Sequence, residues 1–328
     1  MIRLANFVAI IYCVAICGCG AAPRAESGGA AKKFRIAVIP KGTSHDFWNS
    51  VRAGVEQAAA EFPELDVIWK GPLSEGNTAD QIKIVEDFVA DGYDGICLAP
   101  LDAIALRKPV DQCLRNKIPV VIFDSGLQDQ SGIVSYVATN NYRGGQRAGE
   151  HLVELLGGKG RVILMRYDLN SQSTEERERG FLDSLAPHKD IQLLSHDKYA
   201  GPDESGATLL AENLLANFGE QVDGIFCPNQ STASGMLTVL ERFHLAGKVK
   251  FIGFDSGRNL AEGLARGVVH ATVLQDPVKM GYDAVRVMYD HLQGKPVPKV
   301  VETQEALATT ENHGDPKVHA LLYPAAAR

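Results

Sequence analysis

The chain has 328 residues, of which 45% are hydrophobic and 22% are charged, and 33 basic against 40 acidic residues give a net charge of −7. This length suits two domains, or one large α/β unit, and the composition excludes a disordered or fibrous chain. The mildly acidic balance lacks the basic surface that phosphate binding requires, so we expect no nucleic acid partner, and six cysteines in this length do not make a disulfide scaffold.

The first 18 residues are typical of an export signal. They combine one positive charge, Arg3, with an apolar stretch over residues 4–17, which is shorter than the roughly 20 residues that span a bilayer. The pair Gly18-Cys19 resembles the lipobox of bacterial lipoproteins, in which the Cys is lipid-modified. We therefore expect a lipoprotein signal peptide over 1–18 and a lipid on Cys19. A plain cleaved secretion signal is the alternative.

Residues 19–33 are rich in Ala, Gly and Ser and have no apolar periodicity, which predicts a flexible tether. The protein is thus expected in the periplasm or cell envelope, anchored to a bacterial membrane through its lipid. Cys97, Cys113 and Cys227 follow the tether in apolar or helical contexts, and we expect them to be buried thiols.

From Phe34 onward, β-branched runs alternate with amphipathic stretches. Helices are predicted between the first strands, and such alternation is typical of βαβ units with a parallel sheet that is covered on both faces. The first set of predicted elements is strands 35–39, 66–69, 95–98, 120–123 and 133–138, with helices 47–61, 78–90 and 103–116. A second set of strands, 161–165, 192–195, 224–226, 250–254 and 270–274, predicts a second α/β domain.

The two halves share a short duplicated sequence. Phe123-Asp124-Ser125-Gly126 in the first half is echoed by Phe254-Asp255-Ser256-Gly257 in the second. Each Asp follows a buried strand, at the sheet edge where open α/β proteins bind ligands. The alternative for each Asp is a helix N-cap. Paired carboxylates also suggest a glycosidase, but carboxylates on separate lobes are poorly held for catalysis.

Motifs for other chemistry are missing from the sequence. It has no glycine-rich nucleotide-binding motif after a strand, no zinc-protease motif and no nucleophile elbow, and its nine His show no metal-ligand spacing. We therefore expect no cofactor and no metal.

Several short motifs, taken together in order and spacing, carry a family resemblance from Phe34 to about residue 310. They are Ile36-Ala37-Val38-Ile39-Pro40-Lys41, His45-Asp46-Phe47-Trp48, Phe123-Asp124-Ser125, Thr139-Asn140-Asn141, Ser173-Thr174 with Arg177, Pro228-Asn229, Gly253-Phe254-Asp255 and Gln275. With these motifs the chain resembles the ribose-binding-type periplasmic sugar-binding proteins, which are substrate-binding components of ABC importers.

The resemblance implies a site in which aromatic rings stack on a sugar and polar groups bind its hydroxyls. It implies stacking by Phe47, Trp48 and, opposite them, Tyr199. The polar residues that it implies, with those that differ from the ribose-type pattern, are Lys41, His45, Asp124, Ser125, Arg177, Asn229, Asp255 and Gln275. These differences, which include Lys41 and His45, make ribose itself doubtful as the ligand.

Alternatives remain open for several of these residues. Phe47 and Trp48 open a helix and could be core packing, and the charges around Arg177 suit a solvated helix start. Lys41 could pair with Asp124 or meet an acidic or phosphorylated ligand.

The expected fold is of the type I periplasmic binding proteins, with two doubly wound Rossmann-like lobes joined by three crossings near residues 139, 275 and 296. The first lobe would comprise 34–139 plus 276–296, and the second 140–275 plus 297–328. The implied function is to close on a monosaccharide-like ligand and deliver it to an ABC permease and its ATPase, as a monomer and without catalysis. A sugar-sensing subunit of a signalling receptor, a carbohydrate-active enzyme and the effector domain of a repressor are the alternatives, although the last requires a helix-turn-helix where this chain has its signal.

Overall fold

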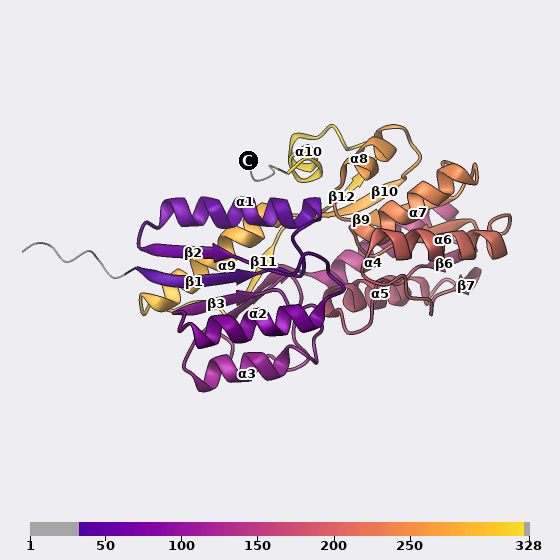
Figure 1. The fold of residues 1–328 in the computed structure, drawn as a ribbon. Helices are drawn as coiled ribbons and strands as arrows, with labels where there is room; N and C mark the ends of the chain where they lie inside the picture. Colours follow the sequence, from indigo (N-terminus) through magenta and orange to yellow (C-terminus); the bar gives the residue numbers. More distant parts are fainter. Residues whose placement is uncertain (1–32, 325–328) are drawn as a thin grey trace, which may run out of the picture. The chain divides into compact units, whose positions relative to one another are not determined.

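The computed structural model describes residues 33–324 (Figure 1). The expected signal peptide, the lipid-bearing Cys19 and all but the last residue of the tether lie outside this range. Within it, the chain forms two lobes, each around one six-stranded sheet. No helix of residues 33–324 has the length and apolar character that crossing a membrane requires.

The first lobe contains a sheet of parallel strands with helices on both faces. Its strand order is β11-β5-β4-β3-β1-β2. The strands are β1 (Phe34–Ile39), β2 (Leu65–Trp69), β3 (Gly95–Leu98), β4 (Val120–Phe123), β5 (Ser135–Thr139) and β11 (Val300–Thr303). One face is covered by α1 (Asp46–Glu61) and α9 (Pro277–Leu292), and the other by α2 (Thr78–Ala90) and α3 (Arg107–Arg115). Figure 1 shows α1 and α2 on opposite sides of this sheet.

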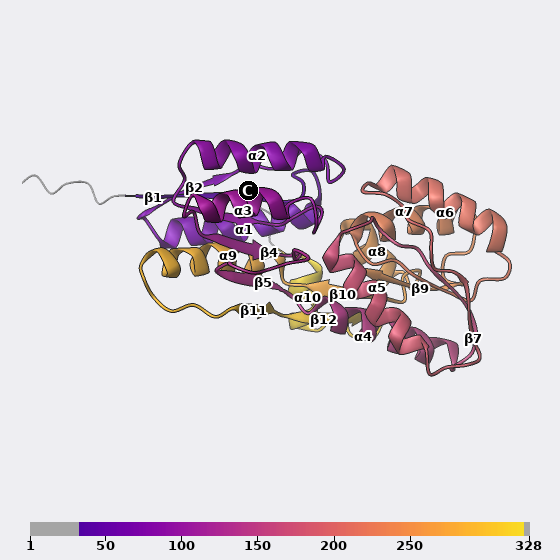
Figure 2. The ribbon, with the colours of Figure 1, turned by 90° about the horizontal axis from the view of Figure 1, so that it is seen from below.

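The second lobe, which Figure 2 shows from another side, repeats this plan. Its strand order is β12-β10-β9-β8-β6-β7. Among the strands that residues 33–324 form, only the edge strand β12 runs antiparallel to its neighbour. The strands are β6 (Gly160–Leu164), β7 (Ile191–Ser195), β8 (Gly224–Phe226), β9 (Lys250–Phe254), β10 (Ala271–Gln275) and β12 (Glu305–Thr309). The helices α4 (Asn141–Leu156) and α5 (Gln172–Leu185) pack on one face, and α6 (Glu204–Phe218), α7 (Gln230–Arg242), α8 (Arg258–Ala265) and α10 (Pro316–Leu322) pack on the other.

These elements follow directly from the local sequence. The strands β3, β4, β8 and β10 are buried at every position, as expected for apolar runs in the middle of a parallel sheet. Cys97, Cys113 and Cys227 are buried free thiols, as predicted. Two doubly wound lobes are therefore confirmed as the fold.

The chain passes three times between the sheets. The first two crossings lie at Asn140, between β5 and α4, and at Asp276, between β10 and α9. The third was expected near residue 296, which is wrong. The strand β11 still pairs with β5 of the first sheet, and the chain changes sheets at Gln304, immediately before β12.

Candidate functional site

The two duplicated corners have the same backbone geometry. Asp124 and Asp255 both adopt left-handed backbone angles, with φ of 61° and 72°, which Asp tolerates better than most residues. The N–H of Asp124 donates to the carbonyl oxygen of Val137 over 3.0 Å, and that of Asp255 to Val273 over 2.8 Å. Neither Asp caps the helix after its strand, because β5 follows the first corner and Gly257 is the N-cap of α8. The alternative, in which each Asp caps the helix that follows its strand, is therefore wrong.

Both carboxylates line one cleft between the lobes. The first lobe contributes the loops after β1, β2 and β4 and the first turn of α1. The second lobe contributes residues just after β6, β8 and β9, the last residue of β10 and the first two turns of α5. The lining residues are Lys41, Phe47, Trp48, Glu75, Asp124, Tyr167, Ser173, Thr174, Arg177, Asn229, Asp255 and Gln275. Eight of the eleven predicted ligand-binding residues are among them, while His45, Ser125 and Tyr199 are not.

Lys41 is a buried cation of the first lobe. Its Nζ donates to Ser171 Oγ over 3.1 Å and to Ser173 Oγ over 3.3 Å, both in the second lobe. The same Nζ lies 3.6 Å from Asp124 Oδ2, so the alternative in which Lys41 pairs with Asp124 is realised. Burial raises the pKa of Asp124, although the charges of Lys41 and Arg177 oppose this effect.

Arg177 is held rigidly in the second lobe. Its guanidinium lies 3.9 Å from the centre of the Phe254 ring, and its Nη1 donates to the Pro228 carbonyl oxygen over 2.9 Å. Its Nε donates to Asn141 Oδ1 over 2.8 Å, and Nη1 is 3.9 Å from Asp255 Oδ2. The residue is only 2% exposed, so a solvated helix start is the wrong description. A fork of donors fixed in this way is well suited to neighbouring oxygen acceptors.

Asp255 is the centre of a second hydrogen-bonded group. Its Oδ2 accepts from the N–H of Gln230, the first residue of α7, over 3.0 Å, and its Oδ1 accepts from Gln275 Nε2 over 2.6 Å. Burial raises its pKa, and the charge of Arg177 opposes the shift. The remaining oxygen, Gln275 Oε1, is buried and has no hydrogen-bond partner among the described residues. An unpaired buried acceptor is costly, and a ligand hydroxyl would satisfy it.

Asn229 is oriented by the start of α7. It is the N-cap of that helix, and its Oδ1 accepts from Thr232 in a capping box. Its Nδ2 donates to Ser231 Oγ over 3.0 Å.

The aromatic wall of the cleft also belongs to the core. Phe47 and Trp48 are 8% and 2% exposed, and their rings meet edge to face with centroids 5.0 Å apart. Trp48 also contacts the Phe123 ring, with centroids 6.3 Å apart. Core packing and cleft lining therefore both describe these two residues, whose neighbours hold the ring positions fixed.

Glu75 is a cleft residue that the sequence did not reveal. It lies in the loop between β2 and α2, and its Oε1 accepts from Trp48 Nε1 over 2.6 Å and is 3.2 Å from His45 Nδ1. The hydroxyl of Tyr167, in the other lobe, donates to its Oε2. Burial by itself would raise the pKa of Glu75, but the interactions with His45, Lys41 and Tyr167 outweigh it and lower the pKa to about 2. His45 thus supports Glu75 instead of lining the cleft.

Tyr199 was predicted as the opposing aromatic, and this is wrong. Its side chain lies over the guanidinium of Arg166, and the residue is 38% exposed. Tyr167 lines the cleft instead, with its N–H bound to Glu178 Oε1 over 3.1 Å. The signal for Tyr167 was its place just after a predicted strand. Ser125 is fully buried behind the cleft wall, and its Oγ accepts from the N–H of the cleft residue Ser173.

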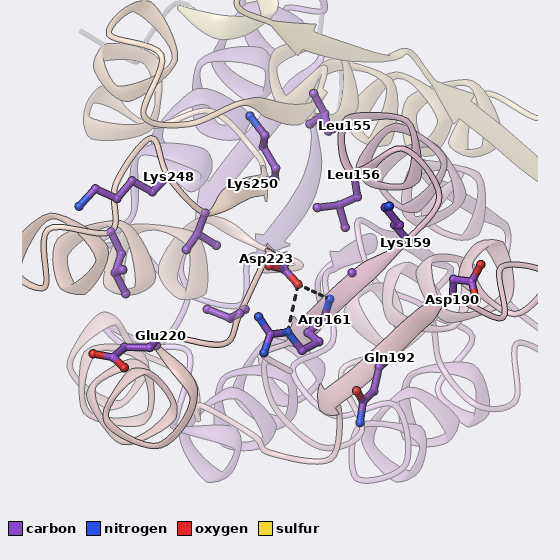
Figure 3. Close-up of a pocket in the computed structure, with 15 residues that line it drawn as sticks. Leu155, Leu156, Lys159, Arg161, Asp190, Gln192, Glu220, Asp223, Lys248 and Lys250 are labelled. Atoms are coloured by element: carbon purple, nitrogen blue, oxygen red, sulfur yellow. Dashed lines mark hydrogen bonds and ion pairs between the residues drawn. The ribbon is translucent and has the colours of Figure 1, made fainter.

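A larger hollow, of about 870 Å³, lies at the opposite edge of the second sheet (Figure 3). It is formed where β6, β8 and β9 begin, and its charged residues include Lys159, Asp223 and Lys250. The Asp223 carboxylate there accepts two hydrogen bonds from Arg161, one from its backbone N–H and one from its Nε. Since this hollow shares no residue with the cleft and lies where strands start, we place the functional site in the smaller cleft.

Comparison with known proteins identifies the family and the fold of this chain. The model of the periplasmic binding protein domain matches residues 36–296. The D-allose-binding periplasmic protein of Escherichia coli (strain K12) is 27% identical over 270 residues, which are 80% of this chain and 86% of that protein. The ribose import binding protein RbsB of Bacillus subtilis (strain 168) is 26% identical over 285 residues, 87% of this chain and 90% of that protein.

A solved structure gives the same result. An ABC transporter solute binding protein from Agrobacterium vitis, with bound D-fucose, is 30% identical and superimposes with a TM-score of 0.85, covering 88% of this chain and 100% of its own. The family predicted from the sequence motifs is therefore confirmed, and the chain belongs to the periplasmic binding proteins of ABC transport systems.

Proposed function

We propose that this protein binds a neutral monosaccharide or polyol in the cleft and delivers it to an ABC permease. The observation that carries the ligand class is the pairing of charges around the cleft. Lys41 lies beside Asp124, Arg177 beside Asp255, and His45 beside Glu75, at 3.6, 3.9 and 3.2 Å. No cation of this set is left for an anionic ligand, so hydroxyl groups suit the cleft better than an acid or a phosphate.

Each part of the cleft has a role in sugar binding. Carboxylates accept hydroxyl hydrogens, Arg177 and Asn229 donate, and Gln275 Oε1 offers a free acceptor. The rings of Phe47, Trp48 and Tyr167 supply apolar surface for the C–H faces of the sugar. Of the named relatives, one is a D-allose-binding protein, one is a ribose import binding protein and one has bound D-fucose, which supports this class without selecting one sugar.

Closure of the lobes is the proposed mechanism. A ligand that contacts both lobes favours the closed form, in which the lobes are together. Ligand binding thus increases the population of a form that a permease can recognise. Catalysis is not part of the proposal, because the carboxylates lie on separate lobes whose separation changes with closure. Both lobes of the cleft belong to one chain, which supports a monomer with one ligand.

A thermal-shift screen across pentoses, hexoses, polyols and sugar acids tests the ligand class. A bound sugar at about 100 times its Kd should add about 2.7 kcal/mol to the free energy of unfolding. Calorimetry with the best sugar should give one ligand per chain. If only sugar acids or phosphates raise the melting temperature, the neutral class is wrong.

We also propose that lipid on Cys19 anchors the protein to a bacterial membrane. The support is the Gly18-Cys19 pair followed by a small-residue stretch. A Cys19→Ser variant expressed in the native host should move from the membrane fraction to the soluble periplasmic or culture fraction. If both forms fractionate alike, the anchor is refuted and a plain secretion signal remains.

A further inference from the structure

The helix α5 begins against the other lobe. The N-caps of α2, α4, α6, α7 and α9 each accept a backbone N–H of their own helix through their side chain. Ser171, the N-cap of α5, makes no such bond, and its hydroxyl accepts from Lys41 instead. The N–H of Ser173, in the first turn, donates over 3.1 Å to the hydroxyl of Ser125, which belongs to the first lobe.

A second hydrogen bond runs in the opposite direction. The N–H of Gly126, in the first lobe, donates to Gln172 Oε1, at the start of α5, over 2.9 Å. Backbone N–H groups of both lobes are thus satisfied by side chains of the opposite lobe, as in a capping box shared between two domains. We call this group, Ser125, Gly126, Gln172 and Ser173, the inter-lobe clasp.

The clasp borders the ligand-binding surface, which it reaches only through Ser173 among its four residues. Neither Ser125 nor Gln172 lines the cleft. A third contact nearby connects the same lobes, since the N–H of Ala103 donates to the carbonyl oxygen of Asn170 over 2.9 Å, and Asn170 Nδ2 donates to Asp102 Oδ2 over 3.0 Å. These bonds break when the lobes separate.

We propose that the clasp stabilises the closed form directly, so that Ser125 and Gln172 set the affinity for every ligand without touching any. A hydroxyl that accepts a hydrogen bond from the first turn of a helix stabilises that arrangement. Its loss should therefore lower the ratio of closed to open molecules about tenfold. The part of the proposal that concerns affinity rests on the proposed sugar-binding function, whereas the part that concerns closure does not.

Hydrogen exchange in the ligand-free protein tests the closure. The N–H of Ala103 reports on separation, because its acceptor lies in the other lobe and the residue is remote in sequence from the clasp. In Ser125→Ala and in Gln172→Ala, measured by NMR on the full chain, exchange at Ala103 should be about tenfold faster than in the wild type. Unchanged exchange at Ala103 in both variants would overturn the proposal, whatever the protein binds.

Ligand binding tests the effect on affinity. For each sugar that the thermal screen identifies, Ser125→Ala should weaken binding by the same factor of about ten, mainly through faster dissociation, because closure is common to all ligands. The rank order of the sugars should not change. A changed rank order would show that Ser125 contributes to ligand selectivity. Tighter binding in the variant would show that the clasp stabilises a form that cannot bind the ligand. Either result refutes the proposal.

The duplication supplies a matched control. Ser256 stands in the second corner where Ser125 stands in the first, and its hydroxyl makes no hydrogen bond among those of the described residues. Ser256→Ala should leave both the exchange at Ala103 and the sugar affinities unchanged. If it speeds exchange as much as Ser125→Ala does, the effect is a general loosening of the corners and not the clasp.

Discussion

An Asp255→Asn variant is expected to bind its ligand at least about 30-fold more weakly than the wild type while folding normally. The amide keeps the size of the side chain and tolerates the left-handed backbone, and its oxygen can still accept from the N–H of Gln230. It removes the negative charge beside Arg177 and one acceptor for hydroxyls or for Gln275. Losing one partner of a buried charged pair costs about 2 kcal/mol or more in binding.

The same variant should be no less stable without ligand, and its melting temperature should stay or rise. Burial raises the pKa of Asp255, so the folded protein binds this proton more tightly than the unfolded chain. That contribution to stability decreases as pH rises, and at neutral pH the ionised carboxylate is a net cost that Asn does not have. Titration calorimetry and thermal unfolding measure the two effects.

Asp223→Asn is the control for this prediction. Asp223 lies in the same lobe but in the distant hollow, where it pairs with Arg161. Its replacement should leave ligand affinity unchanged. If Asp255→Asn binds the ligand with wild-type affinity, the prediction is wrong, and the role of Asp255 is only to accept the first N–H of α7.

Glu75→Gln is expected to have the opposite effect on stability. The pKa of Glu75 is lowered from 4.5 to about 2, which corresponds to a stabilisation on the order of 3 kcal/mol at neutral pH. In the wild type this contribution is present above about pH 4.5 and is lost as the pH falls toward 2. The variant lacks it, so its melting temperature should be several degrees lower at pH 6 and should depend less on pH in the acid range.

The protonation of His45 sets the upper pH limit of the stabilisation by the His45–Glu75 pair. The hydrogen bond to Glu75 raises the pKa of His45 above its ordinary 6.5. The contribution of a charged His45 is therefore complete below pH 6.5 and is lost as the pH rises through the raised value. The His45–Glu75 pair should stabilise the protein most between about pH 4.5 and 6.5, as a series of unfolding curves would show.

A double-mutant cycle separates Glu75 from its partner across the cleft. Glu75→Gln and Tyr167→Phe should be non-additive, because they remove the two ends of one hydrogen bond between the lobes. Glu75→Gln and Tyr199→Phe should be additive, since Tyr199 lies outside the cleft on Arg166. Glu86→Gln, on the exposed surface of α2, is the control for the loss of a carboxylate. Equal coupling with both tyrosines would refute the assignment of Tyr167 to the cleft.

The sequence was most informative at the short motif that both halves of the chain share. The duplicated Phe-Asp-Ser-Gly corners predicted two facing lobes, because a buried strand followed by Asp appears at matched places in both halves. It was least informative where a role depends on a distant contact. Glu75 stands in a polar stretch of small residues that is typical of a turn, and only Trp48, His45 and Tyr167 make it a cleft residue.

The errors have similar physical causes. Tyr167 and Tyr199 follow neighbouring strands. The β-bridge between Arg166 and Tyr199 places the Tyr199 ring on the Arg166 guanidinium, outside the cleft. The strand β11 was missed because an edge strand of four residues with mostly exposed side chains has no continuous apolar run. Missing it moved the predicted third crossing by several residues.

The three crossings have a consequence for how this protein can evolve. Neither lobe is a continuous piece of chain, because the first needs α9 and β11 and the second needs β12 and α10, all from the C-terminal part. A single recombination event therefore cannot exchange one whole lobe for that of a relative without leaving a sheet or a helix layer incomplete. New ligand preferences should accordingly arise by point substitutions within the cleft, and chimeras that swap a lobe intact require three joined breakpoints, at 140, 276 and 304.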